Sequence, residues 1–351
     1  MGVESTLSTP VTELFNIKYP VILAGMHIAA GPRLAAAVTN AGGLGVLGAL
    51  SCKTPDMLRS AIVELKSYLN DENAPFGVDM ALPKIGDGAR KTNHPYHHGP
   101  LDPFIDVMIE MGCKLFVCAV GIPPHEAVEK FHKHGIVVMN MVGAAKHVPK
   151  ALENGADMVC AQGSEGGGHT GSTPTSLLIP TVVDIAKAYT SPLTGKPVNV
   201  VAAGGMYSGK SLAAALAWGA SAVWVGTRFV ASVESGAPEE HKKKVLECNF
   251  DGTVRTIIYT GRPLRVFKTP YVKDWEQNRQ KEIEELTSKG IIPYEHELDN
   301  GLEDTDENSR YLMGETAATV KDILPAKEIV EDMVNEAVQQ IVRVSKFQTK
   351  L

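Results

Sequence analysis

The chain has 351 residues, of which 44% are hydrophobic and 21% are charged, as is typical of a soluble globular protein with a sizeable core. Its formal net charge of −6 argues against a general nucleic-acid-binding protein. No apolar run approaches the roughly 18 residues of a membrane span, and the N-terminus carries no secretory signal. We therefore expect a cytoplasmic protein that contacts neither nucleic acid nor membrane.

The C-terminus and the cysteines also bear on location. The chain ends in Thr349-Lys350-Leu351, one residue away from the peroxisomal S-K-L signal, which makes the peroxisome the alternative location. The cysteines are odd in number, irregularly spaced and mostly in apolar segments, so we predict reduced thiols and no disulfide framework. They are Cys52, Cys113, Cys118, Cys160 and Cys248.

Short apolar runs recur along the first three quarters of the chain. There are eight of them, at 19–26, 44–50, 76–82, 114–121, 136–143, 157–163, 198–205 and 221–229. Each is almost continuously apolar, without the alternation of a half-exposed strand. Such runs are typical of strands that are buried on both faces of a parallel sheet.

Helical patterns separate these runs. Residues 32–42 begin with proline and end with glycine, and residues 54–69 begin with Thr54 as an N-cap followed by Pro55. Further helices are expected at 123–135, 144–155 and 208–219. Eight strand–helix units predict a (β/α)₈ TIM barrel. An open, doubly wound sheet is the alternative, and the barrel is favoured because no second domain is evident.

The regular alternation ends after the eighth run, where 250–275 is expected to form a basic, aromatic extension. We assign residues 1–275 to the barrel and residues 276–351 to a C-terminal helical extension. This extension is expected to pack on the barrel or on a subunit partner, an arrangement that a homodimer would provide. Its expected parts are a helix at 276–289, an acidic loop at 297–308 and an amphipathic helix near 325–345.

One long segment, 83–100, interrupts the alternation after the third run. Loops of this length in compact domains are usually functional lids or mobile segments. Arg90 and Lys91 are candidates to meet an anionic substrate, although exposed lid charges are the alternative. Three histidines occur in the segment without a nearby cysteine or acidic partner, so we predict no metal site. These are His94, His97 and His98.

The ends of the seventh and eighth runs carry glycine pairs suited to phosphate. Active sites of TIM barrels lie at the C-terminal ends of the strands, and phosphate frequently binds to the last two of these ends. Backbone N–H groups of Gly205, Gly226 and Thr227 can approach an anion closely. We therefore predict a phosphate site here.

The same stretch has a competing interpretation. Residues 204–211, GGMYSGKS, match the P-loop pattern, which would make the protein a nucleotide hydrolase. Such an enzyme also needs an aspartate that ends another buried strand, to help hold magnesium. None of the eight runs ends in one, and Asp79 lies within its run. We interpret the match as a coincidence, and both interpretations place phosphate at the same strand end.

The sixth run leads into AQGSEGGGHTG at 161–171. His169 can act as a base, an acid or a charge partner, and the alternative is an ordinary surface histidine. Glu165 is a candidate to orient His169 or to cap a turn. Gln162, at the strand end, can donate and accept hydrogen bonds to a heteroaromatic ring.

These motifs together resemble one family. AQGSEGGGHTG with upstream YPVILAGM, and AAGGM followed by VGTRF, resemble the nitronate monooxygenases over roughly residues 10–270. The resemblance implies a barrel that holds non-covalent FMN and an active-site histidine, His169, that acts on the substrate. The implied cofactor residues are Ala24, Gly25 and Met26 along the flavin ring, Asp79 near it where the family often has asparagine, Gln162 against the ring, Gly167 and Gly168 beside it, and Gly204, Gly205, Gly226 and Thr227 at the phosphate.

The resemblance also implies an activity, the oxidation of small alkyl nitronates, and of nitroalkanes, with dioxygen. The glycine–histidine motif is shared with flavin-dependent enoyl and quinone reductases of the same superfamily, so an NAD(P)H-dependent reductase is the alternative. A barrel that has kept its phosphate site and lost catalysis is the non-enzymatic alternative. The loop 83–100 and the tail differ from the short bacterial forms, so the resemblance does not fix the substrate.

Overall fold

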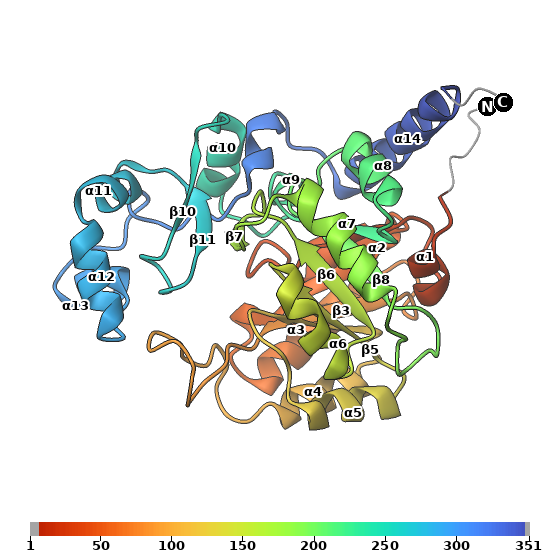
Figure 1. Cartoon of the computed structure of the whole chain (residues 1–351), viewed down its shortest axis with the longest axis horizontal. Coiled ribbons are helices and arrows are strands. Elements are labelled where there is room, and N and C mark those ends of the chain that lie inside the picture. The colour runs from red at the N-terminus through yellow and green to blue at the C-terminus, as the bar shows by residue number, and fades with distance from the viewer. Residues whose placement is uncertain (1–6, 348–351) are drawn as a thin grey trace.

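Eight parallel strands form a barrel in the computed structural model, which describes residues 7–347 of the chain (Figure 1). The strand order is β1-β9-β8-β6-β5-β4-β3-β2. The ring closes where Ile22 bridges Leu44 and the amide of Leu23 donates to the carbonyl of Leu44 at 2.9 Å. The strands coincide with the eight apolar runs, and the predicted TIM barrel is confirmed. They are β1 (Val21–Leu23), β2 (Gly45–Gly48), β3 (Phe76–Ala81), β4 (Leu115–Ala119), β5 (Val137–Val142), β6 (Met158–Gln162), β8 (Asn199–Ala203) and β9 (Ala222–Val225).

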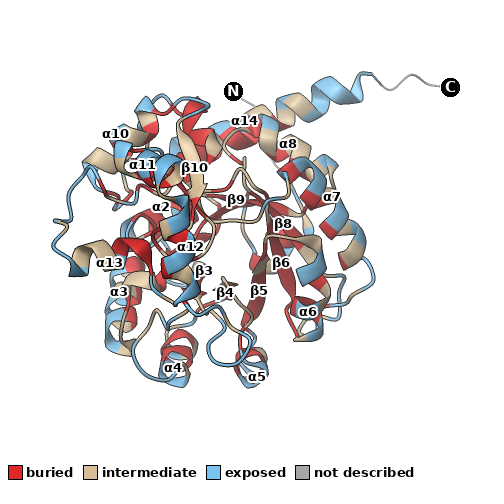
Figure 2. Ribbon diagram, turned by 60° about the vertical axis from the view of Figure 1, so that its left-hand side comes forward, coloured by how far each residue is buried: buried red, intermediate tan, exposed pale blue. Residues whose placement is uncertain are grey.

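Helices follow the strands and cover the barrel from outside, with their exposed faces toward solvent (Figure 2). The predicted N-cap of α3 is confirmed, because the Thr54 hydroxyl accepts from the amide of Met57 at 3.3 Å. The helices of this layer are α2 (Pro32–Asn40), α3 (Pro55–Ser67), α4 (Asp102–Glu110), α5 (His125–Lys133), α6 (Val148–Glu153), α7 (Thr175–Ala186), α8 (Gly209–Ala217) and α9 (Thr227–Val230), with short 3₁₀ turns η1 (Ala49–Ser51) and η2 (Ala145–His147).

Two hydrophobic clusters stabilise this unit. One lies between the strands and the surrounding helices, and the other fills the inside of the barrel with side chains such as Val117, Met139 and Trp224. Helix α1 (Pro10–Phe15), which precedes β1, adds Val11 and Phe15 to the inner cluster. The N-terminal end of the barrel is therefore closed by α1, and the C-terminal strand ends face the opposite side.

A second, antiparallel sheet of three strands lies beside the barrel mouth, the C-terminal end of the barrel. Its order is β10-β11-β7, with β7 (Gly168–His169), β10 (Thr253–Thr256) and β11 (Leu264–Phe267). Leu264 pairs with His169 and Arg265 pairs with Gly168. The sequence predicted a loop at 161–171 and a basic, aromatic extension at 250–275, and not this sheet, because β7 has only two residues and its partner is about 95 residues away. The consequence is that His169 is fixed on a strand.

Helices α11, α12 and α13 form a separate lobe, and helix α14 lies along the flank of the barrel (Figure 1). Side chains from both sides of position 275 share one hydrophobic cluster, which includes Val266, Trp275 and Leu286. The helix predicted at 276–289 is divided: α11 ends at Asn278, Arg279 is not helical, and α12 begins at Gln280. The elements are α10 (Glu239–Glu247), α11 (Pro270–Asn278), α12 (Gln280–Ser288), α13 (Pro293–Asp299), the 3₁₀ turn η3 (Glu315–Thr319) and α14 (Ala326–Ser345).

Helix α14 confirms the amphipathic helix predicted near 325–345, and it packs on α8 and α2 of the barrel. The acidic segment 297–308 starts inside α13 and continues as a loop. None of the helices within residues 7–347 is both long and apolar enough to cross a bilayer. The tripeptide Thr349-Lys350-Leu351 lies outside the described residues.

Candidate active site

The ends of β1, β3 and β9 meet at the barrel mouth. A Cβ atom added to Gly25 would overlap the carboxyl group of Asp79. A Cβ atom added to Gly226 would lie 3.4 Å from Met26 Sδ and 3.5 Å from Ala24 Cβ. Five of the predicted cofactor residues are therefore neighbours in space, although they come from three distant parts of the sequence.

Asp79 is an acidic side chain inside the barrel, with 8% of its surface exposed. Burial raises its pKa to about 8, because an apolar environment disfavours the charged form. The group is therefore mostly protonated at neutral pH. A neutral carboxyl can both donate and accept a hydrogen bond, as an asparagine amide can. The difference from the asparagine that is frequent in the family is therefore small below pH 8.

His169 lies next to the hairpin that joins β10 to β11. Its Nε2 atom is 3.0 Å from Thr260 Oγ1, and its backbone carbonyl accepts from Gln162 Nε2 at 2.8 Å. Burial, and then the positive charge of Arg262, lower the pKa of His169 to about 4. His169 is therefore neutral at physiological pH. The side-chain amide nitrogen of Gln162 therefore holds residues 161–171, which we call the glycine loop, in place.

The hydrogen bonds of Thr260 favour one tautomer of His169. The Thr260 oxygen accepts from the backbone amide of Arg262 at 3.4 Å. When the hydroxyl donates to the carbonyl of Arg262, at 3.3 Å, its second lone pair accepts from Nε2–H of the imidazole. The proton of the neutral ring then resides on Nε2, and Nδ1 keeps its lone pair. In this tautomer, Nδ1 can accept a proton and act as a base. Thr260 was not recognised in the sequence.

Glu165 caps a helix and does not orient His169. Its carboxylate accepts from the backbone amide of Thr175 at 3.0 Å and from the hydroxyl of Thr175 at 2.7 Å. Thr175 is the first residue of α7, where backbone donors lack intrahelical partners. Of the two roles considered for Glu165, the structure supports capping.

A segment of the C-terminal tail crosses the glycine loop. The backbone of Met313 and Gly314 fills the space that a Cβ atom on Gly167 would need. The amide of Gly314 donates to Thr227 Oγ1 at 2.9 Å, and the amide of Glu315 donates to the carbonyl of Glu165 at 3.0 Å. Gly167 therefore faces protein. Nothing in the sequence pattern indicated this crossing.

Two other glycines, Gly168 and Gly205, leave open space at the mouth, whereas a Cβ atom on Gly204 would lie 2.8 Å from the carbonyl oxygen of Gly163. Gly168, Gly204 and Gly205 have φ angles of 68°, 80° and 77°, a region that side-chain-bearing residues rarely adopt. A Cβ atom on Gly205 would meet nothing closer than 3.9 Å, and one on Gly168 would meet nothing within 4 Å. A ligand can therefore contact the backbone directly at Gly168 and Gly205, which fits the predicted cofactor positions.

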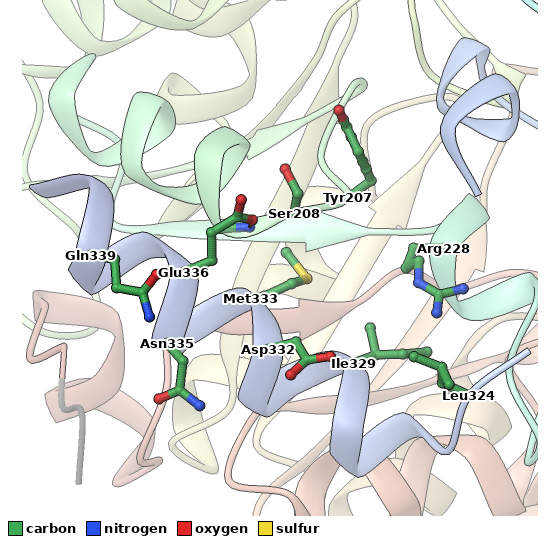
Figure 3. Close-up of a pocket in the computed structure, with 11 residues that line it drawn as sticks. Tyr207, Ser208, Arg228, Leu324, Ile329, Asp332, Met333, Asn335, Glu336 and Gln339 are labelled. Carbon is green, nitrogen blue, oxygen red and sulfur yellow. Dashed lines mark hydrogen bonds between the residues drawn. The ribbon is translucent and has the colours of Figure 1, made fainter. Parts of the chain in front are cut away.

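The P-loop-like stretch has a different geometry from a triphosphate cradle (Figure 3). The amides of Gly209 and Lys210 donate to Glu336 Oε2 of α14, at 2.8 and 3.3 Å. The Lys210 ammonium is exposed and lies 3.7 Å from the other oxygen of the same carboxylate. A carboxylate thus occupies the place that a phosphate takes in a P-loop, and this argues against nucleotide hydrolysis.

The long loop 83–100 contacts the tip of the β10–β11 hairpin. Arg262 Nε donates to Asn93 Oδ1 at 2.9 Å, and Arg90 Nη1 donates to the carbonyl of Gly261 at 3.5 Å. Lys91 Nζ donates to the carbonyl of Ser288 at 2.8 Å, away from the mouth. Within residues 7–347, no group of three His, Cys, Asp or Glu side chains is placed to hold a metal ion.

Arg262 was also not predicted as a site residue, although the sequence contains a signal for the hairpin that carries it. The turn TGRP lies between two short stretches rich in β-branched and apolar residues, TVRTII and LRVF, which is the pattern of a hairpin. When a strand of this hairpin pairs with another segment, the turn of the hairpin, and therefore Arg262, lies beside that segment. The pairing with the glycine loop is the part that only the structure shows.

The fold is that of a TIM barrel, a class of protein in which active sites lie at the C-terminal strand ends. Comparison with known proteins gives the particular family. The family model described as nitronate monooxygenase matches residues 8–336. The chain belongs to this family of oxidoreductases, which are generally flavin-dependent.

Individual relatives carry different names. The chain is 38% identical over 270 residues to "(3aS,4S,5R,7aS)-5-hydroxy-7a-methyl-1-oxo-octahydro-1H-indene-4-carboxyl-CoA dehydrogenase" of Mycobacterium tuberculosis, covering 77% of this chain and 69% of that protein. It is 34% identical to a probable nitronate monooxygenase of Staphylococcus saprophyticus, with 76% and 80% covered. The solved structure of FabK from Thermotoga maritima aligns with a TM-score of 0.77 and 31% identity, covering 98% and 100%.

Proposed function

We propose that the chain is an FMN-dependent oxidoreductase with its reaction centre at the barrel mouth. The proposal is supported by membership of a generally flavin-dependent family and by the open backbone at Gly168 and Gly205. Ala24, Met26 and Asp79 would line the flavin ring. FMN would supply the electron acceptor when it is bound, and the protein orients the substrate and moves the proton.

The observation that carries the proposal is the position of His169, which β11 fixes next to the open backbone of Gly168. The lowered pKa leaves this imidazole unprotonated at pH 7, so its lone pair is available to accept a proton at Nδ1, although the same shift makes it a weaker base than an ordinary histidine. Toward a nitroalkane, this atom would remove the proton on the carbon next to the nitro group. The guanidinium of Arg262, whose charge acts on His169, would balance the negative charge of the nitronate.

Oxidation of alkyl nitronates with dioxygen is the leading activity, in keeping with the family and with the Staphylococcus relative. A second candidate is favoured by the Mycobacterium relative, whose name describes a dehydrogenase of a carboxyl-CoA compound. That candidate is an NAD(P)H-dependent flavin reductase or dehydrogenase of an enoyl, quinone or thioester substrate. The two activities differ in what reduces the flavin.

An anaerobic reduction screen tests this proposal. The protein is loaded with FMN, freed of excess cofactor, and mixed without oxygen with ethyl nitronate, 2-propyl nitronate, NADH or NADPH while flavin absorbance is followed. Bleaching by the nitronates alone supports the leading activity, and bleaching by a nicotinamide nucleotide supports the second. Protein that retains no FMN after incubation, under conditions where its far-ultraviolet circular dichroism shows a folded barrel, would contradict both.

A further inference from the structure

The hydroxyl group of Thr227 is buried, and its proton has no acceptor in the described part of the chain. Thr227 is the first residue of α9 and is 8% exposed. Its Oγ1 atom accepts from the backbone amide of Gly314 at 2.9 Å, which is the one hydrogen bond of this side chain to residues 7–347. A hydroxyl can also donate, and a buried donor without an acceptor costs free energy. The O–H group of Thr227 is therefore available to an acceptor on a ligand.

Two backbone amides at the same corner of the mouth are also unpaired. Strands β8 and β9 pair in parallel, so the residues that follow them meet at this corner. The amides of Gly205 and Gly226 donate to no other residue between 7 and 347. The next cation in sequence, Arg228, bonds to Asp322 Oδ1 at 2.7 Å and to two backbone carbonyls. The donors at this corner are therefore uncharged, and their direction decides how well they bind an anion.

Residues 313–315, which we call the tail strap, are bonded to the glycine loop and to the β10–β11 hairpin as well as to α9. The amide of Glu315 donates to the carbonyl of Glu165 at 3.0 Å. The carboxylate of Glu315 lies 2.9 Å from Arg265 Nη2. Bonds to separate segments therefore fix the tail strap, and with it the direction of the Gly314 amide.

Gly314 fits into the tail strap because it has no side chain. A Cβ atom at this position would lie 2.5 Å from the carbonyl oxygen of Glu165 and 3.0 Å from the amide nitrogen of Gly167. The φ angle of Gly314 is −84°, which every residue can adopt, so the close contact alone requires glycine. An alanine here would push the tail strap away from the glycine loop and draw its amide away from Thr227.

We propose that the tail strap is a positioning element for the phosphate end of FMN. The amide of Gly314 occupies one lone pair of Thr227 Oγ1, which directs the O–H group away from the strap and toward the corner formed by Gly205 and Gly226. There the hydroxyl and the two amides would donate to phosphate oxygens, which are acceptors. This inference rests on the proposed binding of FMN. It gives a role in cofactor binding to a segment that follows the last barrel strand.

Titration of the flavin-free full chain with FMN and with riboflavin, followed by the quenching of flavin fluorescence, tests the tail strap. Riboflavin has the same ring and lacks the phosphate. We expect Gly314→Ala and Thr227→Val each to weaken FMN binding by roughly tenfold to a hundredfold, and riboflavin binding by less than about threefold. Thr227→Ser keeps the hydroxyl and should bind FMN like the unaltered protein. Thr319→Val is the matched control, since Thr319 Oγ1 donates to the carbonyl of Thr316 within η3.

A double-mutant cycle separates positioning from general support of the fold. If the tail strap acts through the hydroxyl, the double variant should bind FMN no more than about threefold more weakly than Thr227→Val alone. Equal losses for FMN and riboflavin, or FMN binding in both single variants that matches Thr319→Val, would overturn this inference and leave the proposed function intact. Failure of the unaltered protein to bind FMN would overturn both. Circular dichroism identifies a single variant that does not fold, and the other single variant then decides.

Discussion

Arg262 and Arg265 lie three residues apart in the β10–β11 hairpin, the first in its turn and the second within strand β11. Arg265 is 9% exposed and bonds to Glu315 at 2.9 Å, to the carbonyl of Ser164 at 3.1 Å and to Thr253 at 3.0 Å. Arg262 has one short bond to a neutral side chain. The paired arginine joins the tail to the glycine loop, whereas the other keeps its charge available at the mouth.

Other ionisable groups also divide into those that have a bonding partner and those that lack an oppositely charged one. Several of these groups have partners: His132 lies 2.9 Å from Asp157, and the carboxylates of Glu165 and Glu336 accept from backbone amides at helix N-termini. At the mouth, Asp79 is buried and His169 is partly buried, neither has an oppositely charged partner among residues 7–347, and the pKa of each is shifted toward the neutral form. Keeping such groups costs stability, which is typical of functional sites.

Removing the imidazole of His169 should have the largest effect on turnover. We expect His169→Asn to retain FMN and to lose turnover by roughly 10³-fold, because asparagine cannot accept a proton at Nδ1. Steady-state rates and flavin absorbance measure the two properties. His132→Asn, which removes a paired histidine at the opposite end of the barrel, should leave turnover unchanged. Equal turnover in His169→Asn and the unaltered protein would make His169 a bystander.

The second largest effect concerns Asp79 and pH. The unfolded chain releases this proton near the ordinary value of 3.8, whereas the folded chain keeps it until about pH 8. The free energy of unfolding of the apoprotein should therefore fall between pH 4 and pH 8, relative to Asp79→Asn, by about 5 kcal/mol. Urea titrations of both proteins at pH 5, 6, 7 and 8 measure this difference. Parallel pH profiles would show that Asp79 ionises normally.

The two arginines of the hairpin give the third test. Arg265→Gln should lower the free energy of unfolding by about 2–3 kcal/mol, since it leaves buried acceptors without donors. Arg262→Gln should lower it by less than about 1 kcal/mol, since one hydrogen bond is lost at a partly open position. Urea titrations at pH 7 compare the two. A larger loss for Arg262→Gln would reverse the assignment of their roles.

The smallest expected effect is a shift in a pH profile. The base at His169 is active when it is unprotonated, so kcat/KM should fall only as pH approaches 4. Arg262→Gln removes a positive charge and should move this fall to higher pH by less than about one unit, because burial remains as the larger cause. Arg310→Gln should leave the position of the fall unchanged. A downward shift in Arg262→Gln would contradict the assigned electrostatics.

The barrel was predictable because its information is local. Each buried strand is a continuous apolar run, and cues such as Thr54 and Pro55 define helix starts within a few residues. Asp79 also carried a signal, as an acidic residue inside an apolar run. The ambiguity of Glu165 was real in the sequence, because capping and orienting both require a carboxylate near the loop.

The parts that escaped prediction depend on pairing between distant segments. The strand Gly168–His169 is too short to have a pattern of its own and exists only because β11 lies beside it. Gly167 was expected beside a cofactor, and its contact with Met313 depends on a segment about 146 residues later.

The crossing of the glycine loop by residues 313–315 has a consequence for how the protein is made. On the ribosome, residues 161–171 emerge long before the segment that packs on Gly167 and bonds to Thr227 and Glu165. The barrel strands are complete by residue 225, yet the mouth acquires its last protein contacts only when nearly nine-tenths of the chain has been translated. Nascent chains released before residue 313 would thus contain a whole barrel with an unfinished mouth.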